Sequence, residues 1–287
     1  MNPEVAYKET YPRLFALAYR MTGSVAESED VIQEAWTRLL KEPDGKVDSI
    51  PAWLYRTVSN LAIDALRTSK RTATGYHGPW LPEPISTDTY FRTPESEAIM
   101  REDLSMALLL MLENLPPIQR AVWVLRTSLE LSFSEIGAIV ERTEENCRQL
   151  FRRAKKRIEG SGSENLSVAP LPLVESFITA ISIGDVGRVA SLLTDDARWI
   201  GDGGGVKLAT ARPVVGSDKV SRGLTSLVQK NAPEWRMEPA TINGQAGLLV
   251  FHQGELDAAY VFLGNDQAIS HVLTIRNPHK LSGLRLR

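Results

Sequence analysis

Seven basic side chains crowd into residues 142–157, beside only two acidic ones. As a helix, this segment gathers its apolar residues on one face and its Arg, Lys and Gln side chains on the other. Such a helix fits the DNA major groove, where Arg and Gln reach base edges and Lys and Arg contact phosphates. Thr143 stands at the N-cap, so the helix N-terminus can also face a phosphate. The DNA-binding candidates are Thr143, Asn146, Arg148, Gln149, Arg152, Arg153, Lys155 and Lys156.

This segment follows a shorter predicted helix at 133–140 and a turn at 141–143, which together predict a helix-turn-helix. The net charge of the whole chain is only −2. The charge is unevenly distributed, however, because residues 142–157 carry a net +5 and residues 72–141 a net −6. A local basic cluster attracts phosphate whatever the overall balance, although a merely solvated helix face explains the same charges.

A second polar stripe lies on a predicted helix that begins near Pro51. An exposed aromatic ring beside Arg and Asn suits stacking on an unpaired base and holding single-stranded backbone. In the other interpretation, Trp53 anchors a core and Arg56 pairs with a neighbouring acid. The candidates on this stripe are Trp53, Arg56, Asn60 and Arg67.

The preceding predicted helix carries Asp30, Gln33 and Glu34 on one face. An acidic face of this kind does not bind nucleic acid. It suits a basic protein partner, or it is simply solvated.

The C-terminal half, from about residue 171, changes from helices to alternating strands and glycine-marked turns, which predicts an α+β domain with an antiparallel meander. Two segments stand out there: a glycine loop within WIGDGGGVK, and a turn at NPHKL. Three consecutive glycines allow backbone conformations that other residues avoid. Their candidate residues are Asp202, Gly203, Gly204, Gly205, Lys207, Asn277, Pro278, Lys280 and Leu281.

The resulting domain prediction is helical at 1–71, a linker at 72–96, helix-turn-helix at 97–160, a linker at 161–170, and α+β at 171–287. In the first linker, Trp80, Leu81 and Tyr90 are able to dock onto a neighbour. No apolar run is long enough to span a membrane, and the N-terminus lacks a signal-peptide pattern. One cysteine and four scattered histidines give no metal-ligand spacing. We therefore expect a cytoplasmic protein without a metal or a cofactor.

Three blocks change the balance between these alternatives: MTGSVAESEDVIQEAWTRLL, PAWLYRTVSNLAIDALRTSKR and FSEIGAIVERTEENCRQLFRRAKKRI. In this order and spacing, residues 5–160 resemble regions 2 and 4 of extracytoplasmic-function (ECF) RNA polymerase sigma factors. The resemblance implies that the Asp30–Gln33–Glu34 face docks on the clamp helices of the polymerase's largest subunit. It also implies that the helix bearing Trp53 melts and reads the minus-ten element of promoter DNA, and that the helix bearing Arg148 reads the minus-thirty-five element.

Residues 168–287 resemble the SnoaL-like cone fold. Together with the linker sequence GPWLPEP, they make the chain similar to the SigJ type of ECF sigma factor, in which this domain is a C-terminal extension. That group carries an Asp-Gly-Gly-Gly-Lys loop and an Asn-Pro-Asp-Lys-Leu tail. Here Val206 separates the glycines from Lys207, and His279 replaces the tail aspartate.

The leading hypothesis is thus a sigma factor that its own C-terminal domain regulates, with no enzymatic activity and no separate anti-sigma factor. The first alternative is a helix-turn-helix regulator with a ligand-sensing C-terminal domain. The second is a SnoaL-like enzyme with a DNA-binding appendage. Its acid–base candidates are Asp202, His252 and His271.

Overall fold

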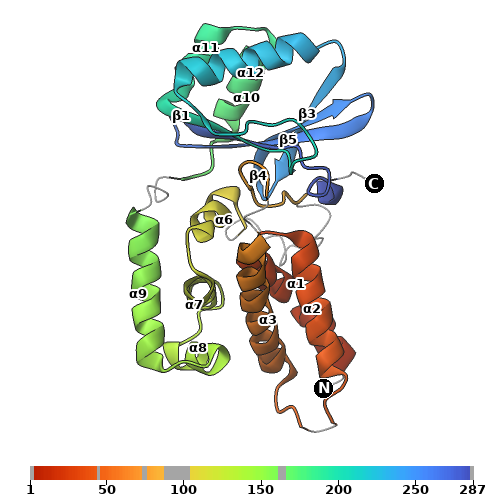
Figure 1. The fold of residues 1–287 in the computed structure, drawn as a ribbon, viewed down its shortest axis with the longest axis vertical. Helices are drawn as coiled ribbons and strands as arrows, with labels where there is room; N and C mark the ends of the chain where they lie inside the picture. The colour runs from red at the N-terminus through yellow and green to blue at the C-terminus, as the bar shows by residue number, and fades with distance from the viewer. Residues whose placement is uncertain (1–2, 44–45, 73–75, 87–103, 161–165, 285–287) are drawn as a thin grey trace. The chain divides into compact units, whose positions relative to one another are not determined.

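The structure is a computed structural model, and its described residues fall into two compact units. We call residues 1–74, 93–104 and 108–164 the helical unit, and residues 75–92, 105–107 and 165–287 the C-terminal unit. Each unit is described by itself. The residues that the structure describes are 3–43, 46–72, 76–86, 104–160 and 166–284 (Figure 1).

The helical unit begins with α1 (Pro3–Thr22), α2 (Val25–Leu39) and α3 (Ile50–Thr72). Helix α1 ends before Gly23, and this glycine has a φ of 69°. Ser24 then caps α2, because its side chain accepts a hydrogen bond from the backbone N–H of Glu27 at 3.4 Å. The three helices pack against one another around buried apolar side chains, among them Leu14, Ile32 and Leu54.

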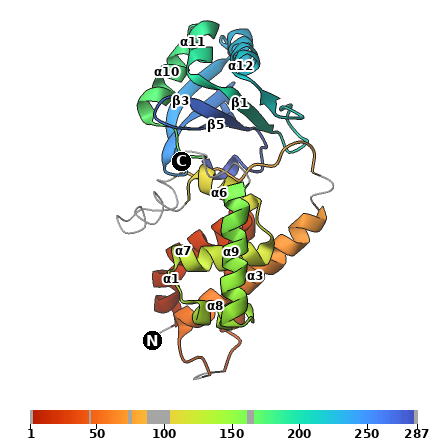
Figure 2. The ribbon, with the colours of Figure 1, turned by 90° about the vertical axis from the view of Figure 1, so that its left-hand side faces the viewer.

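The second part of this unit contains α6 (Met106–Glu113), whose first two residues belong to the C-terminal unit, and α7 (Pro117–Ser128), α8 (Phe133–Val140) and α9 (Glu144–Gly160). Ser132 and Glu135 form a capping box at the start of α8, and Glu141 ends that helix in a left-handed conformation. Helices α8 and α9 are the predicted helix-turn-helix, and both pack against α7 (Figure 2).

A buried arginine connects the two parts of the helical unit. Arg120 of α7 is 1% exposed, and its Nη1 donates to the backbone oxygen of Met21 at 2.7 Å. The same nitrogen lies 2.7 Å from a carboxylate oxygen of Glu113. Helix α7 also contacts α1 and α3. Region-2-like and region-4-like helices therefore share one packed unit.

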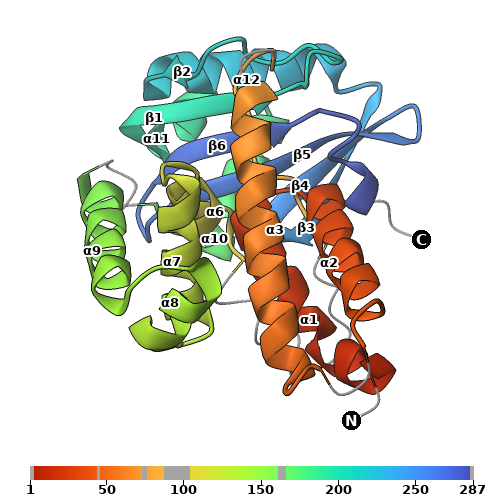
Figure 3. The same cartoon turned by 60° about the horizontal axis from the view of Figure 1, so that its bottom comes forward.

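The C-terminal unit places α10, α11 and α12 on one face of a six-stranded sheet (Figures 1 and 3). Its sheet order is β2-β1-β6-β5-β4-β3. The elements are α10 (Leu171–Ser182), α11 (Val186–Ser191), β1 (Leu193–Asp202), β2 (Val214–Val215), α12 (Ser217–Asn231), β3 (Trp235–Ile242), β4 (Gln245–His252), β5 (Glu255–Gly264), β6 (Ile269–Ile275) and the 3₁₀ helix η3 (Ser282–Leu284).

The α+β class agrees with the prediction, but two details differ. Strands β3 to β6 form the predicted antiparallel meander, whereas β1 pairs with β6 in parallel. Helix α12 was not predicted at all. It explains the parallel pair, because it carries the chain from β2 at one edge of the sheet to β3 at the other, and the meander then returns to β1.

Aromatic and aliphatic side chains fill the space between the helices and the sheet. Phe177 of α10 meets Phe262 of β5, with their ring centroids 5.4 Å apart. Val220, Leu224 and Val228 of α12 belong to the same buried cluster. A small cavity of about 20 Å³ lies among these side chains. The interior of the C-terminal unit is therefore packed as a core.

Candidate functional site

Helix α9 separates its residues into the two predicted faces. Cys147, Ala154 and Ile158 are buried, and the ring of Phe151 stacks on Trp123 with centroids 5.2 Å apart. Burial raises the pKa of the Cys147 thiol, which fits a small core residue. The exposed residues are Thr143, Asn146, Arg148, Gln149, Arg152, Arg153, Lys155 and Lys156.

These exposed side chains differ in their partners. Gln149 donates to Glu145 at 3.3 Å, and Lys155 lies 3.8 Å from Glu159. Arg148 pairs with Glu144 and lies over the ring of Phe133, 5.7 Å from its centroid. Within the described part of the chain, no acidic side chain pairs with Arg152, Arg153 or Lys156. Their charges are therefore available to an external anion.

The start of α9 has the predicted cap. The hydroxyl oxygen of Thr143 accepts a hydrogen bond from the backbone N–H of Asn146 at 3.2 Å. This bond satisfies one of the N–H groups that every helix leaves open at its N-terminus. Thr143 and Asn146 are both exposed at the turn between α8 and α9.

On α3, the predicted stripe is only partly exposed. Trp53 and Asn60 are half-buried, while Arg56 and Arg67 are exposed. Arg56 Nη2 lies 3.2 Å from Glu141, in the turn of the helix-turn-helix, and Arg67 pairs with Asp64 at 2.9 Å. Arg56 thus has the acidic neighbour of the second interpretation. The pair is exposed and therefore weak, so it leaves Arg56 able to exchange Glu141 for a phosphate.

On α2, Asp30, Gln33 and Glu34 are all exposed. Val31, Ile32 and Ala35 turn inward from the same turns of helix. Glu34 pairs with Arg38 at 2.8 Å, one turn further along. The predicted acidic face is therefore present at the surface.

The glycine loop of the C-terminal unit begins at a fully buried carboxylate. Asp202 ends β1 with no exposed surface. It accepts hydrogen bonds from the hydroxyl of Tyr76, from the backbone N–H of Leu81 at 2.9 Å, and from that of Gly204 at 3.0 Å. Lys280 Nζ lies 2.8 Å from its Oδ2. Two of these four donors come from the 76–81 segment of the first linker.

Lys280 is the second half of this arrangement, and it is 7% exposed. Its ammonium group also donates to the backbone oxygen of Leu81 and lies 4.1 Å from the ring centroid of Trp80. A cation facing an aromatic ring is stabilised, most of all where water is excluded. We call Tyr76, Trp80, Leu81, Asp202 and Lys280 the linker clasp.

The remaining loop and tail residues support the clasp. Asn277 is buried, and its Nδ2 donates to the Tyr76 hydroxyl at 3.1 Å. A Cβ on Gly204 would lie 2.3 Å from that same nitrogen, and one on Gly203 would lie 2.0 Å from the backbone oxygen of Lys207. The loop therefore needs glycine at both positions. Leu281 is buried, and Pro278 is exposed in the turn.

Lys207 and His279, the two departures from the family pattern, lie outside the clasp. Lys207 is about half-exposed and pairs with Asp257 at 3.1 Å, and Asp257 also meets Arg276 at 2.7 Å. Burial alone would raise the pKa of Asp257, but hydrogen bonding to Lys207 and the charge of Arg276 lower it overall. His279 contributes its backbone N–H to Asn277.

The three acid–base candidates have separate partners. His252 pairs with Glu234 at 2.7 Å, and His271 contacts Ser270 at 3.0 Å. Burial, with a smaller effect of Arg198, lowers the pKa of His271. Asp202 pairs with Ile275 in the sheet, four positions along β6 from His271. The described residues therefore show no contact among the three.

Sequence reasoning noted the docking potential of Trp80 and Leu81 but did not identify Tyr76, nor the pairing of Asp202 with Lys280. The available signal was the aromatic and proline content of GYHGPWLPEP, in a segment otherwise typical of a linker. Tyr90, the third predicted docking residue, lies outside the described residues. No helix that the structure describes is long and apolar enough to cross a membrane. Nor do the described residues gather three metal-ligating side chains at one point.

Two family models match the chain: Sigma-70 region 2 at residues 6–72, and Sigma-70 region 4 at residues 105–158. An ECF RNA polymerase sigma factor of Mycobacterium tuberculosis, SigJ, is 36% identical over 240 residues, which cover 82% of this chain and 76% of SigJ. The probable ECF sigma factor SigI of the same species is 28% identical over 277 residues, covering 95% and 92%.

The solved crystal structure of M. tuberculosis SigJ superposes with a TM-score of 0.79 at 30% identity, covering 96% of this chain and 97% of that one. The chain therefore belongs to the extracytoplasmic-function sigma factor family. It is an RNA polymerase sigma factor for transcription initiation, with sigma regions 2 and 4 followed by an α+β domain.

Proposed function

We propose that this sigma factor divides promoter recognition between α9 and α3, and that its C-terminal unit regulates both through the linker clasp. The observation that carries the proposal is the clasp itself. Two side chains, Asp202 and Lys280, hold residues 76–81 through four contacts, and these residues belong to the connection between the region 2 and region 4 helices.

For the minus-thirty-five element, the support is the exposed face of α9. Arg152, Arg153 and Lys156 present charges without acidic partners among the described residues. Arg is able to contact guanine O6 and N7 together, and Lys contacts phosphate as a point charge. We assign base reading to Arg148, Gln149 and Arg152, and phosphate contact to Arg153, Lys155 and Lys156.

For the minus-ten element, the support is the half-buried ring of Trp53 beside exposed Arg56. Half-exposure leaves one side of the indole available for base stacking, and Asn60 and Arg67 continue the same stripe. The Arg56–Glu141 pair suggests a coupling between promoter binding and the contact of α3 with α8. A phosphate and Glu141 compete for the same guanidinium group of Arg56. Promoter binding and the separation of α3 from α8 therefore favour each other.

For polymerase binding, the support is the exposed face at Asp30, Gln33 and Glu34. We expect the Asp30→Lys/Glu34→Lys variant to lose co-purification with core RNA polymerase, because reversing two charges makes the contact repulsive. Asp218→Lys, on an exposed residue of α12, is the matched control and should co-purify normally. Normal co-purification of the double variant would remove this assignment.

For regulation, the test is the full-length Trp80→Leu variant in transcription with core polymerase. Loss of the ring weakens the clasp at Lys280, and we expect transcript yield per bound polymerase to change about fivefold or more, the usual size of coupling between sites. Trp235→Leu, a half-buried tryptophan of β3 outside the clasp, should transcribe as the native chain does. An unchanged yield, with residues 76–81 shown by hydrogen exchange to be released, would overturn the proposal.

The proposed site of action is the cytoplasm, where RNA polymerase meets promoter DNA. We also propose that this protein works without a separate anti-sigma factor, because the clasp lets its fused domain act on the linker directly. We propose in addition that it has no enzymatic activity of its own.

A further inference from the structure

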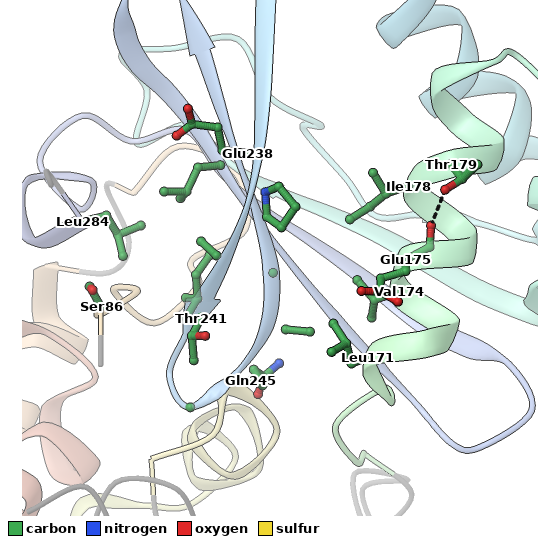
Figure 4. Close-up of a pocket in the computed structure, with 17 residues that line it drawn as sticks. Ser86, Leu171, Val174, Glu175, Ile178, Thr179, Glu238, Thr241, Gln245 and Leu284 are labelled. Carbon is green, nitrogen blue, oxygen red and sulfur yellow. Dashed lines mark hydrogen bonds between the residues drawn. The ribbon is translucent and has the colours of Figure 1, made fainter. Parts of the chain in front are cut away.

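A cavity of about 900 Å³ lies along the open edge of β3 in the C-terminal unit. It is separate from the packed interior between the helices and the sheet, which has almost no free volume. Figure 4 shows Leu171, Val174 and Ile178 of α10 on one side, across from Thr241 and Gln245 of the β3–β4 hairpin. The volume is in the range of sites that hold small organic molecules.

Gln245, which lines this cavity, has one polar atom without a partner among the described residues. Gln245 is 4% exposed, and its Oε1 accepts the backbone N–H of Met106 at 3.2 Å. Its Nε2 is buried and has no hydrogen-bond partner among the residues that the structure describes. A buried donor left in this state costs roughly 1–3 kcal/mol. A ligand that offers an oxygen or nitrogen acceptor would remove that cost.

The charged residues that line the cavity indicate which charge a ligand would carry. Glu175 of α10 lines it and forms no ion pair with the described residues, whereas Glu238 is paired with Arg236. No Lys or Arg is among the described residues that line the cavity. The site therefore repels anions and favours a cationic group near Glu175.

The edge of β3 itself argues against a peptide as the occupant. Pro239 lies in the middle of the lined stretch and has no N–H to donate. The charged pair of Arg236 and Glu238 lies beside it. Proline and charge on an edge strand are features that discourage the addition of another strand.

We propose that this cavity binds a small amphipathic cation: an apolar body against Leu171, Val174 and Ile178, an acceptor at Gln245, and a positive group at Glu175. Ser86, in the described part of the connection between regions 2 and 4, lines the cavity, and Gln245, which also lines it, accepts a hydrogen bond from Met106 at the start of α6. An effect of the bound molecule on transcription rests on the function proposed above. Its binding to the cavity does not depend on that function.

The test uses the full-length chain and two fluorescent probes, dansylcadaverine and dansylglycine. They share a naphthalene body with sulfonyl acceptors but end in an ammonium and a carboxylate group respectively. We expect saturable binding of dansylcadaverine, and weaker binding of dansylglycine. No polymerase is present, so this result bears on the cavity alone and leaves the sigma function untouched.

Two variants locate the binding. Thr241→Trp places a large ring in the cavity from an exposed strand position, and we expect at least about tenfold weaker binding, equivalent to ~1.4 kcal/mol. Glu175→Lys, at an exposed helix position, should reverse the preference toward dansylglycine. Glu255→Lys, an exposed change outside the cavity, should alter neither.

The proposal is overturned by the absence of saturable binding, or by a probe preference that Glu175→Lys leaves unchanged. Native-like affinity in a folded Thr241→Trp chain, checked by circular dichroism, would likewise place the binding elsewhere. If Thr241→Trp does not fold, the charge-reversal variant decides the question.

Discussion

The two units of this protein use their lysines in opposite ways. Lys156 on α9 is exposed and has no acidic partner among the described residues, whereas Lys280 is buried against Asp202 and the ring of Trp80. An exposed charge costs little to maintain and remains free to meet phosphate. A buried charge must be compensated in place, so its role is to fix one arrangement of the chain. In the function proposed here, the environment of each lysine, exposed for Lys156 and buried for Lys280, separates DNA recognition from control.

The largest expected effect is on the buried pair. Lys280→Met leaves the Asp202 carboxylate buried and uncompensated, so we expect the free energy of unfolding of the C-terminal unit to fall by about 3–5 kcal/mol. Urea denaturation followed by circular dichroism measures it. Arg222→Met, which breaks the exposed pair with Asp218, is the control and should cost less than about 1 kcal/mol. Equal costs would remove the contrast between buried and exposed charge.

The next effect concerns the exposed face of α9. We expect Arg148→Ala and Arg152→Ala each to weaken specific promoter binding by roughly 1–3 kcal/mol, because each removes a base contact. Lys156→Ala should instead weaken binding to all sequences and reduce its salt dependence. Binding of each variant holoenzyme to labelled promoter DNA at several salt concentrations separates the two. An equal loss of binding to core polymerase would contradict the assignment.

A smaller effect is expected at the glycine loop. Gly204 has a φ of 61°, and an added Cβ meets Asn277, so Gly204→Ala combines backbone strain with a clash. Gly254→Ala is matched, because its φ is 84° and nothing lies within 4 Å of its Cβ. Strain alone costs about 1–2 kcal/mol, and thermal or urea unfolding should show a larger loss for Gly204→Ala. Identical losses would mean that the loop shape does not depend on Asn277.

The smallest effect is a pH dependence. The pKa of Asp257 is lower in the folded chain than its ordinary value of 3.8, so the carboxylate contributes stability above that value. The contribution is lost as the pH falls further, through the folded pKa. We expect Asp257→Asn to show a shallower loss of stability in acid than the native chain. Parallel curves for the two would rule out this linkage.

The helices were predictable where the apolar spacing is local. The two faces of α9 and the turn before it follow from residues within one segment. The spacing of Val220, Leu224 and Val228 in α12 held the same signal but was overlooked among glycine-marked strands. The parallel pairing of β1 with β6 depends on that crossover, so it was missed as well.

The linker clasp could not be predicted in the same way. Lys280 and Leu81 are 199 positions apart, and Asp202 is 121 positions from Leu81. Neither periodicity nor composition specifies contacts over such separations. The glycines of the loop indicated an unusual backbone, but only the fold shows that Asn277 fills the space beside Gly204. Residue type and family resemblance identified Asp202, Lys280 and the loop glycines as candidates. Only the structure shows which residues they contact.

The most direct test of the central claim is in vitro transcription with bacterial core polymerase, comparing the full chain with a version that ends at Gly162. Promoter candidates come from the DNA upstream of the protein's own gene. We predict promoter-specific transcripts, with a yield that differs between the two forms because the shorter one lacks Asp202, Lys280 and the rest of residues 163–287. If neither form binds core polymerase while the full chain still binds duplex DNA, the account is contradicted in favour of an ordinary helix-turn-helix regulator.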